Sequence, residues 1–319
     1  MRRRLLLGSA CGLSLGALAA DAPWPARAVR IVVPYTPGGF TDNIARLLAP
    51  RLAERLAQPV HIENRAGANS IIGVEHLAHS APDGYSFGIV IAAYAANVSL
   101  YPKLPYNTRD LQPVSLLGSA PLMAVARIGA PFGTFAELLT YAKSHPGRVT
   151  FASSGNGSAA HLTCELLKQR TGTYLVHIPY TGGAQAVMAL AGGQIDLLFD
   201  VGAGVVNAVR QGRARFLGVA SERRISQIPD VPTFIEQGLP DFVSGSWAGM
   251  LAPAAVERAT TQRMAGELQT IVHSDEVSER FAAMVTVPVG GTPEQFSRFL
   301  EAEIRKWGDV IRRAGVQPS

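Results

Sequence analysis

Short apolar runs alternate with segments of helical periodicity along almost the whole chain, and small polar loops join them. The run Ile31-Val32-Val33 is typical of a buried strand, and apolar residues then recur at helical spacing over 44–48. Pro34, Pro37, Gly38 and Gly39 separate the two, so that the pattern reads as strand, glycine turn and helix start. This alternation predicts an α/β protein, with mostly parallel sheets flanked by helices.

The same reading assigns the remaining elements. We expect strands at 29–33, 60–63, 86–92, 114–117, 122–126, 149–152, 175–178, 195–199, 216–220 and 246–251. We expect helices at 41–56, 71–79, 135–144, 161–168, 205–211, 233–237, 254–273 and 293–314, another after Gly183, and a loop at 93–97.

The 319-residue chain is long enough for two domains. We place a signal peptide at 1–20, a discontinuous domain 1 at 21–119 and 245–319, and domain 2 at 120–244. The two crossings, near Gly118–Pro121 and Val243–Gly245, are the expected hinge.

The first glycine turn is a candidate anion socket. Two adjacent glycines let backbone N–H groups turn outward, and the helix dipole adds partial positive charge at the same point. Thr41 and Asp42 can cap the helix that follows. The plain alternative is an ordinary strand-to-helix turn, since such turns are common in α/β proteins.

Four further strand ends carry small polar or glycine-rich loops: 67–70, 153–158, 181–183 and 200–204. Ligands of α/β proteins sit beyond the carboxyl ends of parallel strands. If the chain crosses between domains twice, loops from both domains face one cleft, where opposed helix N-termini hold a small anion.

Composition and the N-terminal sequence indicate an exported protein and argue against nucleic acid as a partner. A hydrophobic content of 47% with 17% charged residues indicates well-filled cores. Arg2–Arg4, the apolar run 5–19 and the small residues of Ala17-Leu18-Ala19 are typical of an export signal. Without those three arginines the 29 basic residues fall to 26, against 24 acidic ones, and no basic stripe indicates nucleic acid.

After cleavage Cys164 is the only cysteine, so that no internal disulfide can form. We expect a packed thiol there. No later apolar stretch is long enough for a membrane span.

Enzymatic readings find little support. Ser153–Ser158 does not match the G-x-S-x-G of a serine hydrolase, and no acid at a recognisable spacing completes a triad with His161 or His177. Gly155–Ala160 formally matches the dinucleotide pattern G-x-G-x-x-A, but the next strand ends at Ile178 without the required acid. Histidine spacing offers no metal cluster. We therefore expect no catalysis, no metal and no cofactor.

The loops together resemble a known family. The order YTPGGFTDNIAR, ENRAGANSIIG, APDGYSF, ASSGNGSAAH, HIPYTGG, GGQIDLLFD, PDVPTFIEQGLPDF and SWAGMLAPA is similar to the periplasmic receptors of tripartite tricarboxylate transporters, the Bug-type solute receptors. The resemblance covers about Trp24 to Gly315. It implies a two-domain, type II periplasmic binding-protein fold that closes around a di- or tricarboxylate, an acidic amino acid or an aromatic carboxylate.

The resemblance also implies a binding site held together by backbone groups and ordered water. Carried over by motif, the ligand-binding residues are, in domain 1, Thr36, Pro37, Gly38, Gly39, Phe40, Thr41, Asp42, Gly67, Ala68, Asn69, Tyr94 and Ala95, and, in domain 2, Ser153, Ser154, Gly157, Ser158, Tyr180, Thr181, Gly182, Gly183 and Asp200.

Each of these has a plain alternative. Asp42 and Ser158 can simply cap helices. Phe40 and Tyr94 can floor the site or belong to the core. Asp200 can meet a positive or protonated ligand group, or orient a neighbouring loop. Arg65, the one arginine in these loops, can pair with Glu63 or reach the cleft rim.

The expected partners are a small carboxylate and the membrane subunits of a transporter, with no stable membrane insertion after signal cleavage. We expect a monomer. A sensor that presents its closed form to a signalling protein is the alternative, because the binding step is the same in both cases.

Overall fold

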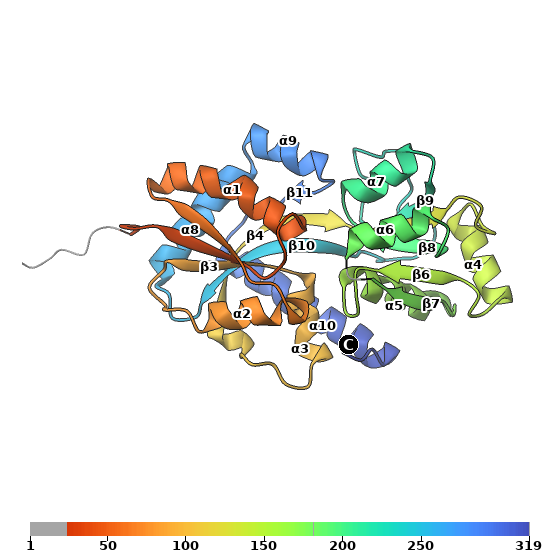
Figure 1. Cartoon of the computed structure of the whole chain (residues 1–319), viewed down its shortest axis with the longest axis horizontal. Coiled ribbons are helices and arrows are strands. Elements are labelled where there is room, and N and C mark those ends of the chain that lie inside the picture. The colour runs from red at the N-terminus through yellow and green to blue at the C-terminus, as the bar shows by residue number, and fades with distance from the viewer. Residues whose placement is uncertain (1–23, 181, 319) are drawn as a thin grey trace, which may run out of the picture.

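Two sheets lie side by side along the long axis of the molecule, each covered by helices on both faces (Figure 1). The computed structural model describes residues 24–180 and 182–318, and the predicted signal segment 1–20 lies outside them. We call the larger sheet with its helices the first lobe, and the smaller sheet with its helices the second lobe.

The first-lobe sheet has six strands. Their order is β11 (Val287–Pro288), β4 (Leu111–Pro121), β10 (Gly245–Pro253), β3 (Ser86–Ile91), β1 (Val29–Val33) and β2 (Val60–Asn64). β1 runs parallel to β2 and β3, whereas β10 is antiparallel to both β3 and β4, and β11 is antiparallel to β4.

The second-lobe sheet has five strands. Their order is β7 (Val176–Pro179), β6 (Thr150–Ser153), β8 (Leu197–Asp200), β5 (Met123–Arg127) and β9 (Ala214–Val219). β6 is parallel to β7 and β8, and β5 is antiparallel to β8 and β9.

The α/β class is thus as predicted, but the sheets are mixed instead of mostly parallel. The reason lies in the connection between the lobes. The chain leaves the first lobe along β4 and returns along β10, and two neighbouring strands that run out and back must be antiparallel.

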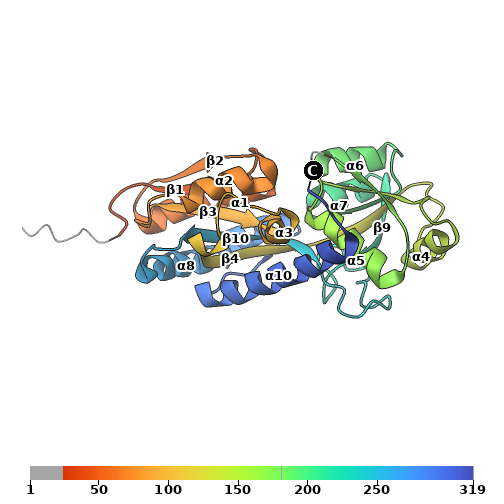
Figure 2. The same ribbon diagram turned by 90° about the horizontal axis from the view of Figure 1, so that it is seen from below.

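Helices cover both faces of each sheet (Figures 1 and 2). In the first lobe, α1 (Phe40–Leu56), α8 (Arg258–Val272) and α9 (Asp275–Ala283) pack on one face, and α2 (Ile71–Ala78), α3 (Ala92–Leu100) and α10 (Pro293–Ala314) on the other. In the second lobe, α4 (Phe135–Ser144) and α5 (Ala159–Thr171) pack opposite α6 (Gly183–Ala191) and α7 (Ala203–Arg210).

The two crossings between lobes touch each other. β4 ends at Pro121, and the next residue, Leu122, donates its N–H to the Ser244 carbonyl (3.0 Å). A Cβ at Gly245 would stand 2.7 Å from the Ala120 carbonyl oxygen, so that only glycine allows this approach. The chain leaves the first-lobe sheet after Pro121 and returns to it at Gly245.

Three predicted elements differ from the structure. The predicted loop 93–97 is part of α3, because Ala92, Ala93, Ala95 and Ala96 favour a helix directly after β3. The predicted helix 254–273 begins only at Arg258, and the separate helix α9 went unrecognised.

The third is the predicted helix Thr233–Gln237, which is only a turn. The Glu236 N–H donates to Thr233 Oγ1 (3.0 Å) and the Thr233 N–H donates to Glu236 Oε2 (2.7 Å), which is the start signal of a helix. Gly238, with φ of 91°, ends it after one turn. Among the described residues, no helix is long and apolar enough to cross a membrane.

Candidate ligand-binding site

The first glycine turn exposes backbone at the start of α1. Thr36, Pro37, Gly38 and Gly39 are exposed, Gly39 is the N-cap, and its helix has no side-chain cap. The N–H groups of the first helical turn have no partner within the helix, so they are free to bind an anion. Phe40 packs against the core.

Asp42 braces this turn from below. Its carboxylate is 1% exposed and accepts hydrogen bonds from the Gly38 N–H (2.8 Å), Arg46 Nε (2.7 Å) and Asn64 Nδ2 (2.9 Å). Burial opposes ionisation, but these donors together outweigh it and lower the pKa of Asp42. Thr41 and Asp42 lie inside the helix, so the prediction that they cap its start is wrong, although Asp42 does tie the turn to the helix.

The second first-lobe loop is backbone-strained. Ala68, Asn69 and Ser70 have φ of 46°, 51° and 77°, which costs an L-residue about 1–2 kcal/mol each. A reciprocal amide pair holds the loop: Asn69 Nδ2 donates to Asn97 Oδ1, and Asn97 Nδ2 donates to the Asn69 carbonyl, both at 2.8 Å. Gly67 precedes these residues with φ of 135°.

Tyr94 and Ala95 belong to the core in this structure. They lie in α3 with exposures of 1% and 0%, and Tyr94 stacks on Tyr106 with ring centroids 6.3 Å apart. The core alternative therefore describes their position, and the expectation that a loop presents them to a ligand is wrong because that segment is helical.

In the second lobe, hydrogen bonds to neutral side chains brace the turn after β6. Ser153 Oγ accepts from the Gly155 N–H (3.1 Å) and lies 2.7 Å from His177 Nε2. The Gly157 N–H donates to His161 Nδ1 (3.1 Å). Ser158 is the N-cap of α5 and accepts from the His161 N–H (3.2 Å), as the capping interpretation predicts.

The two histidines of this turn stack on each other with ring centroids 3.8 Å apart. Burial lowers the pKa of His161 to about 3 and that of His177 to about 4, and the neighbouring Lys168 acts in the same direction. Ser153 is fully buried and Ser154 is exposed.

The remaining wall combines β7, β8 and the start of α6. The Tyr180 N–H donates to the Ser153 carbonyl (3.0 Å), and Gly182 is the N-cap of α6; Thr181 lies outside the described residues. A Cβ on Gly183 would stand 2.4 Å from Asp200 Oδ2, so glycine makes room for this carboxyl group. Burial raises the pKa of Asp200 to about 6, opposed by the Val201 N–H that donates to its Oδ1 (2.8 Å).

One contact joins the two lobes at these loops. A Cβ on Gly157 would lie 2.4 Å from Leu100 Cδ2 and 3.7 Å from Asn69 Nδ2. The second-lobe turn therefore rests directly on α3 and the strained loop of the first lobe. Arg65 pairs with Glu63 (2.5 Å), as one of its two interpretations predicts.

A group of buried hydroxyls beside these loops was not predicted from the sequence. Tyr35 OH, Ser70 Oγ and Tyr106 OH are buried and have no hydrogen-bond partner among the described residues. Tyr35 directly precedes the first turn and Ser70 ends the strained loop. A polar residue next to a glycine turn was the only available signal, and it does not tell a buried hydroxyl from an exposed one.

The comparisons with known proteins concern the family and the overall fold. Residues 44–316 match the family described as "Tripartite tricarboxylate transporter family receptor". This chain belongs to that receptor family. The fold class is thereby confirmed as that of periplasmic binding proteins of this type, and the family consists of receptors, not of enzymes.

Individual relatives span almost the whole receptor. It is 37% identical to Protein BugT of Bordetella pertussis, over 92% of this chain and 91% of BugT. The Rpa4515 protein of R. palustris, solved with adipate, is 32% identical with a TM-score of 0.84, over 93% of this chain and 100% of that one. MatC from Rhodopseudomonas palustris, with bound malate, is 31% identical with a TM-score of 0.79, over 90% and 100%.

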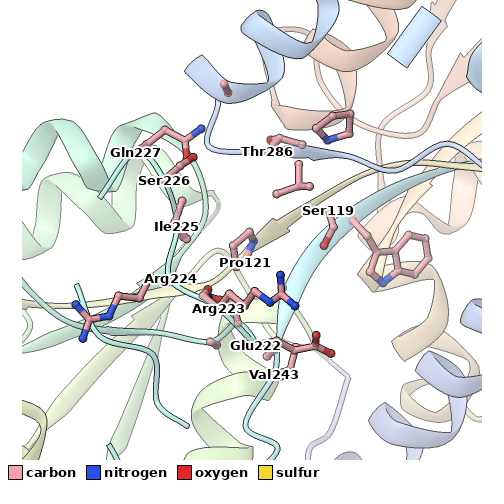
Figure 3. A pocket seen from close by; sticks show the side chains of 18 of the residues that line it. Ser119, Pro121, Glu222, Arg223, Arg224, Ile225, Ser226, Gln227, Val243 and Thr286 are labelled. Carbon is pink, nitrogen blue, oxygen red and sulfur yellow. Dashed lines mark hydrogen bonds between the residues drawn. The ribbon is translucent and has the colours of Figure 1, made fainter. Parts of the chain in front are cut away.

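A pocket of about 700 Å³ lies elsewhere in the receptor (Figure 3). Its lining comes from β4, β10, β11, α9, α10 and the segment after β9. None of the predicted ligand residues that the structure describes takes part in it. Among the described residues, no cluster of His, Cys, Asp or Glu side chains could hold a metal ion.

Proposed function

We propose that the protein is an exported receptor that captures a small carboxylate between its two lobes and delivers it to the membrane subunits of a tripartite tricarboxylate-type transporter. The contact of Gly157 with Leu100 and Asn69 carries this proposal, because it brings loops of the two lobes together. On both sides of that contact, helices begin at glycine-containing turns whose backbone N–H groups suit a carboxylate.

The ligand class follows from what the loops contain. They offer backbone N–H groups and hydroxyls, and their one arginine is held by Glu63, so that recognition relies on small neutral donors. Two solved relatives carry adipate and malate, both dicarboxylates. A dicarboxylate would use helix starts in both lobes. Asp200, with its raised pKa, would accept a ligand ammonium group or donate as a neutral acid.

The mechanism is closure of the two lobes. We propose domain boundaries as predicted, with residues 120–244 turning relative to 21–119 and 245–319 about the paired crossings at Leu122 and Ser244. A ligand that contacts both lobes stabilises the closed arrangement by those additional contacts. Small-angle scattering of the mature protein should show a smaller radius of gyration with ligand; an unchanged value at saturation would contradict closure.

Binding itself is tested by a thermal-shift screen. The panel contains adipate, malate, succinate, citrate, aspartate, glutamate and nicotinate, with NAD and uncharged sugars as controls. At 100 times its dissociation constant a ligand stabilises the fold by about 2.7 kcal/mol, which gives a clear shift in melting temperature. A shift with NAD or sugars alone would overturn the carboxylate assignment.

The second-lobe wall is tested by Gly183→Ala, whose new Cβ must displace Asp200. We expect roughly tenfold weaker carboxylate binding by calorimetry, the equivalent of about 1.4 kcal/mol. The matched control is Gly204→Ala in α7, where the nearest atom would lie 4.0 Å from the Cβ. A variant that loses stability but keeps its affinity would remove Gly183 and Asp200 from the site.

Export and delivery require separate experiments. N-terminal sequencing of the periplasmic fraction should find a chain that lacks about the first 20 residues. Proteoliposomes with the transporter membrane subunits should take up ligand only when the receptor is added. Receptor-independent uptake, combined with ligand-dependent activation of a sensor kinase, would favour the sensing alternative.

A further inference from the structure

The pocket of about 700 Å³ lies on the other side of the crossing strands from the candidate carboxylate site. In the first-lobe sheet, β1 and β3 lie on one side of the β10–β4 pair, and β11, which lines the pocket, lies on the other. In the second-lobe sheet, β6, β7 and β8 lie on one side of β5, and β9 on the other. The two sites are therefore separate.

The pocket has the character of a small-molecule site. Its volume is within the range of about 300–1,000 Å³ that ligand pockets occupy. Apolar side chains from both lobes and both crossings form much of its lining: Pro121, Ile225, Val243, Trp247, Val287 and Phe299. Val243 and Val287 are 37% and 55% exposed, so that apolar surface in the pocket remains open to water.

Most charges around the pocket are already paired. Glu303 accepts from Trp247 Nε1 and Trp307 Nε1, both at 2.9 Å, and also from Lys306. Arg224 Nε donates to both carboxylate oxygens of Glu236, each at 3.0 Å. These groups need no further ligand.

Glu222 and Arg223 differ from them. Both side chains are exposed, and neither has a hydrogen bond or ion pair with any side chain that the structure describes. Figure 3 shows both reaching from the segment after β9 toward β10, into the same part of the pocket. One free carboxylate and one free guanidinium thus border an apolar cavity.

We propose that this hinge-side pocket is a second binding site, for an amino acid with an apolar side chain. The ligand carboxylate would pair with Arg223, its ammonium with Glu222, and its apolar side chain would pack on Trp247 and Phe299. A simple anion would bring its charge close to Glu222, and a simple cation would bring its charge close to Arg223, so a zwitterion fits better than either.

The experiment compares three molecules that share one ring. L-phenylalanine, 3-phenylpropionate and 2-phenylethylamine are titrated calorimetrically into the mature protein, with L-leucine as a second amino acid. We expect at least one amino acid to bind, and the two single-charge analogues of phenylalanine to bind roughly tenfold more weakly or worse, because each loses a charge-assisted hydrogen bond.

Variants locate the site. Arg223→Gln and Glu222→Gln should each weaken amino-acid binding roughly tenfold. Both positions are exposed, so the melting temperature should not change. Arg313→Gln, at an exposed position near the end of α10, is the matched control and should bind as the parent does.

Three outcomes would overturn the proposal. They are the absence of saturable binding of either amino acid at millimolar concentration, binding that Arg223→Gln leaves unchanged, and equal affinity for 3-phenylpropionate and phenylalanine. The proposed carboxylate site can also bind these molecules, so binding is assigned to the hinge-side pocket only where Arg223→Gln weakens it and Gly183→Ala leaves it unchanged. With that assignment the proposal stands or fails independently of the proposed transport function.

Discussion

The turn after β1 and the turn after β6 share one plan but are held differently. In both, a strand runs through glycines into a helix start. The turn after β1 is held by the buried carboxylate of Asp42 with donors from Gly38, Arg46 and Asn64. The turn after β6 is held by Ser153, His161 and His177 without an ionised group. The two backbone turns are similar, but one requires an ionised aspartate and the other requires neutral histidines.

Because of this difference, the two turns are expected to lose stability at different pH values. An ionised Asp42 stabilises the fold until the pH falls below the usual aspartate pKa of 3.8, since its pKa is lowered in the folded state. The two histidines are neutral in the folded state, so their contribution to stability begins to be lost as the pH falls below about 6.5. We expect the second-lobe turn to be the more acid-sensitive one.

The largest expected effect is that of Asp42→Ala. The substitution removes the buried carboxylate that accepts from the Gly38 N–H and from Asn64 Nδ2, which should lower the free energy of unfolding by roughly 3 kcal/mol. Urea unfolding at pH 7 measures it. Arg46→Ala is the control and should cost clearly less, because the Arg46 side chain is 54% exposed. Equal losses would mean that the ion pair, and not the backbone brace, holds the turn.

The next effect is that of pH. Unfolded histidines bind protons below about pH 6.5, but folded His161 and His177 bind them only near pH 3 and 4. Stability therefore falls as the pH drops from 6.5, by at most about 2 kcal/mol per histidine at pH 5. Urea midpoints at pH 7.5 and pH 5 measure this loss.

The double variant His161→Asn/His177→Asn should show a flatter pH dependence over that range, whatever its stability at pH 7.5. Other groups face these rings: Glu165 Oε1 lies 3.7 Å from His161 Nε2, and Lys168 pairs with Glu165. If the stability of the double variant depends on pH as that of the parent does, other groups cause the acid sensitivity.

A smaller effect is expected at the helix caps. Ser158 caps α5 with its side chain, so that Ser158→Ala should cost about 1 kcal/mol, as for other N-caps. Ser158→Asp, which keeps an acceptor at the cap, is the control and should restore most of this stability. A loss well below that figure would show that His161 alone organises the turn.

The smallest effect is expected at the uncapped helix. Gly39→Ser adds a side-chain acceptor at the N-cap of α1, and its Cβ would meet only the Thr36 carbonyl oxygen at 3.6 Å. We expect a gain of a few tenths of a kcal/mol in thermal unfolding, together with weaker carboxylate binding, because the hydroxyl occupies N–H groups that the ligand needs. Stronger binding would contradict the socket at α1.

Local pattern was enough for the elements that carry the loops. β1 and α4 were predicted residue for residue, because an apolar run or a capped amphipathic segment is visible within ten residues. The antiparallel direction of β10 was not predicted. Its pairing with β3 and β4 depends on the two crossings between the lobes, which are far apart in sequence. α3 was missed because its alanines and Tyr94 have no amphipathic pattern when every face is buried.

The site was predictable as a set of loops but not as a set of contacts. Glycine turns mark where backbone is exposed, and the capping role of Ser158 follows from its position. The partners Asn64 for Asp42 and His177 for Ser153 come from other strands, and nothing local identifies them. The hinge-side pocket was not predicted, because its lining is gathered from six separate elements and segments.

The position of β10 has a consequence for how the chain matures. This strand lies between β3 and β4, yet it follows the entire second lobe in sequence. Because the chain is synthesised from the N-terminus, the second lobe can complete its own sheet while β3 and β4 still lack the strand that lies between them. The first lobe closes its sheet only when Gly245–Pro253 arrives, so that a chain still in transit keeps half of its structure open.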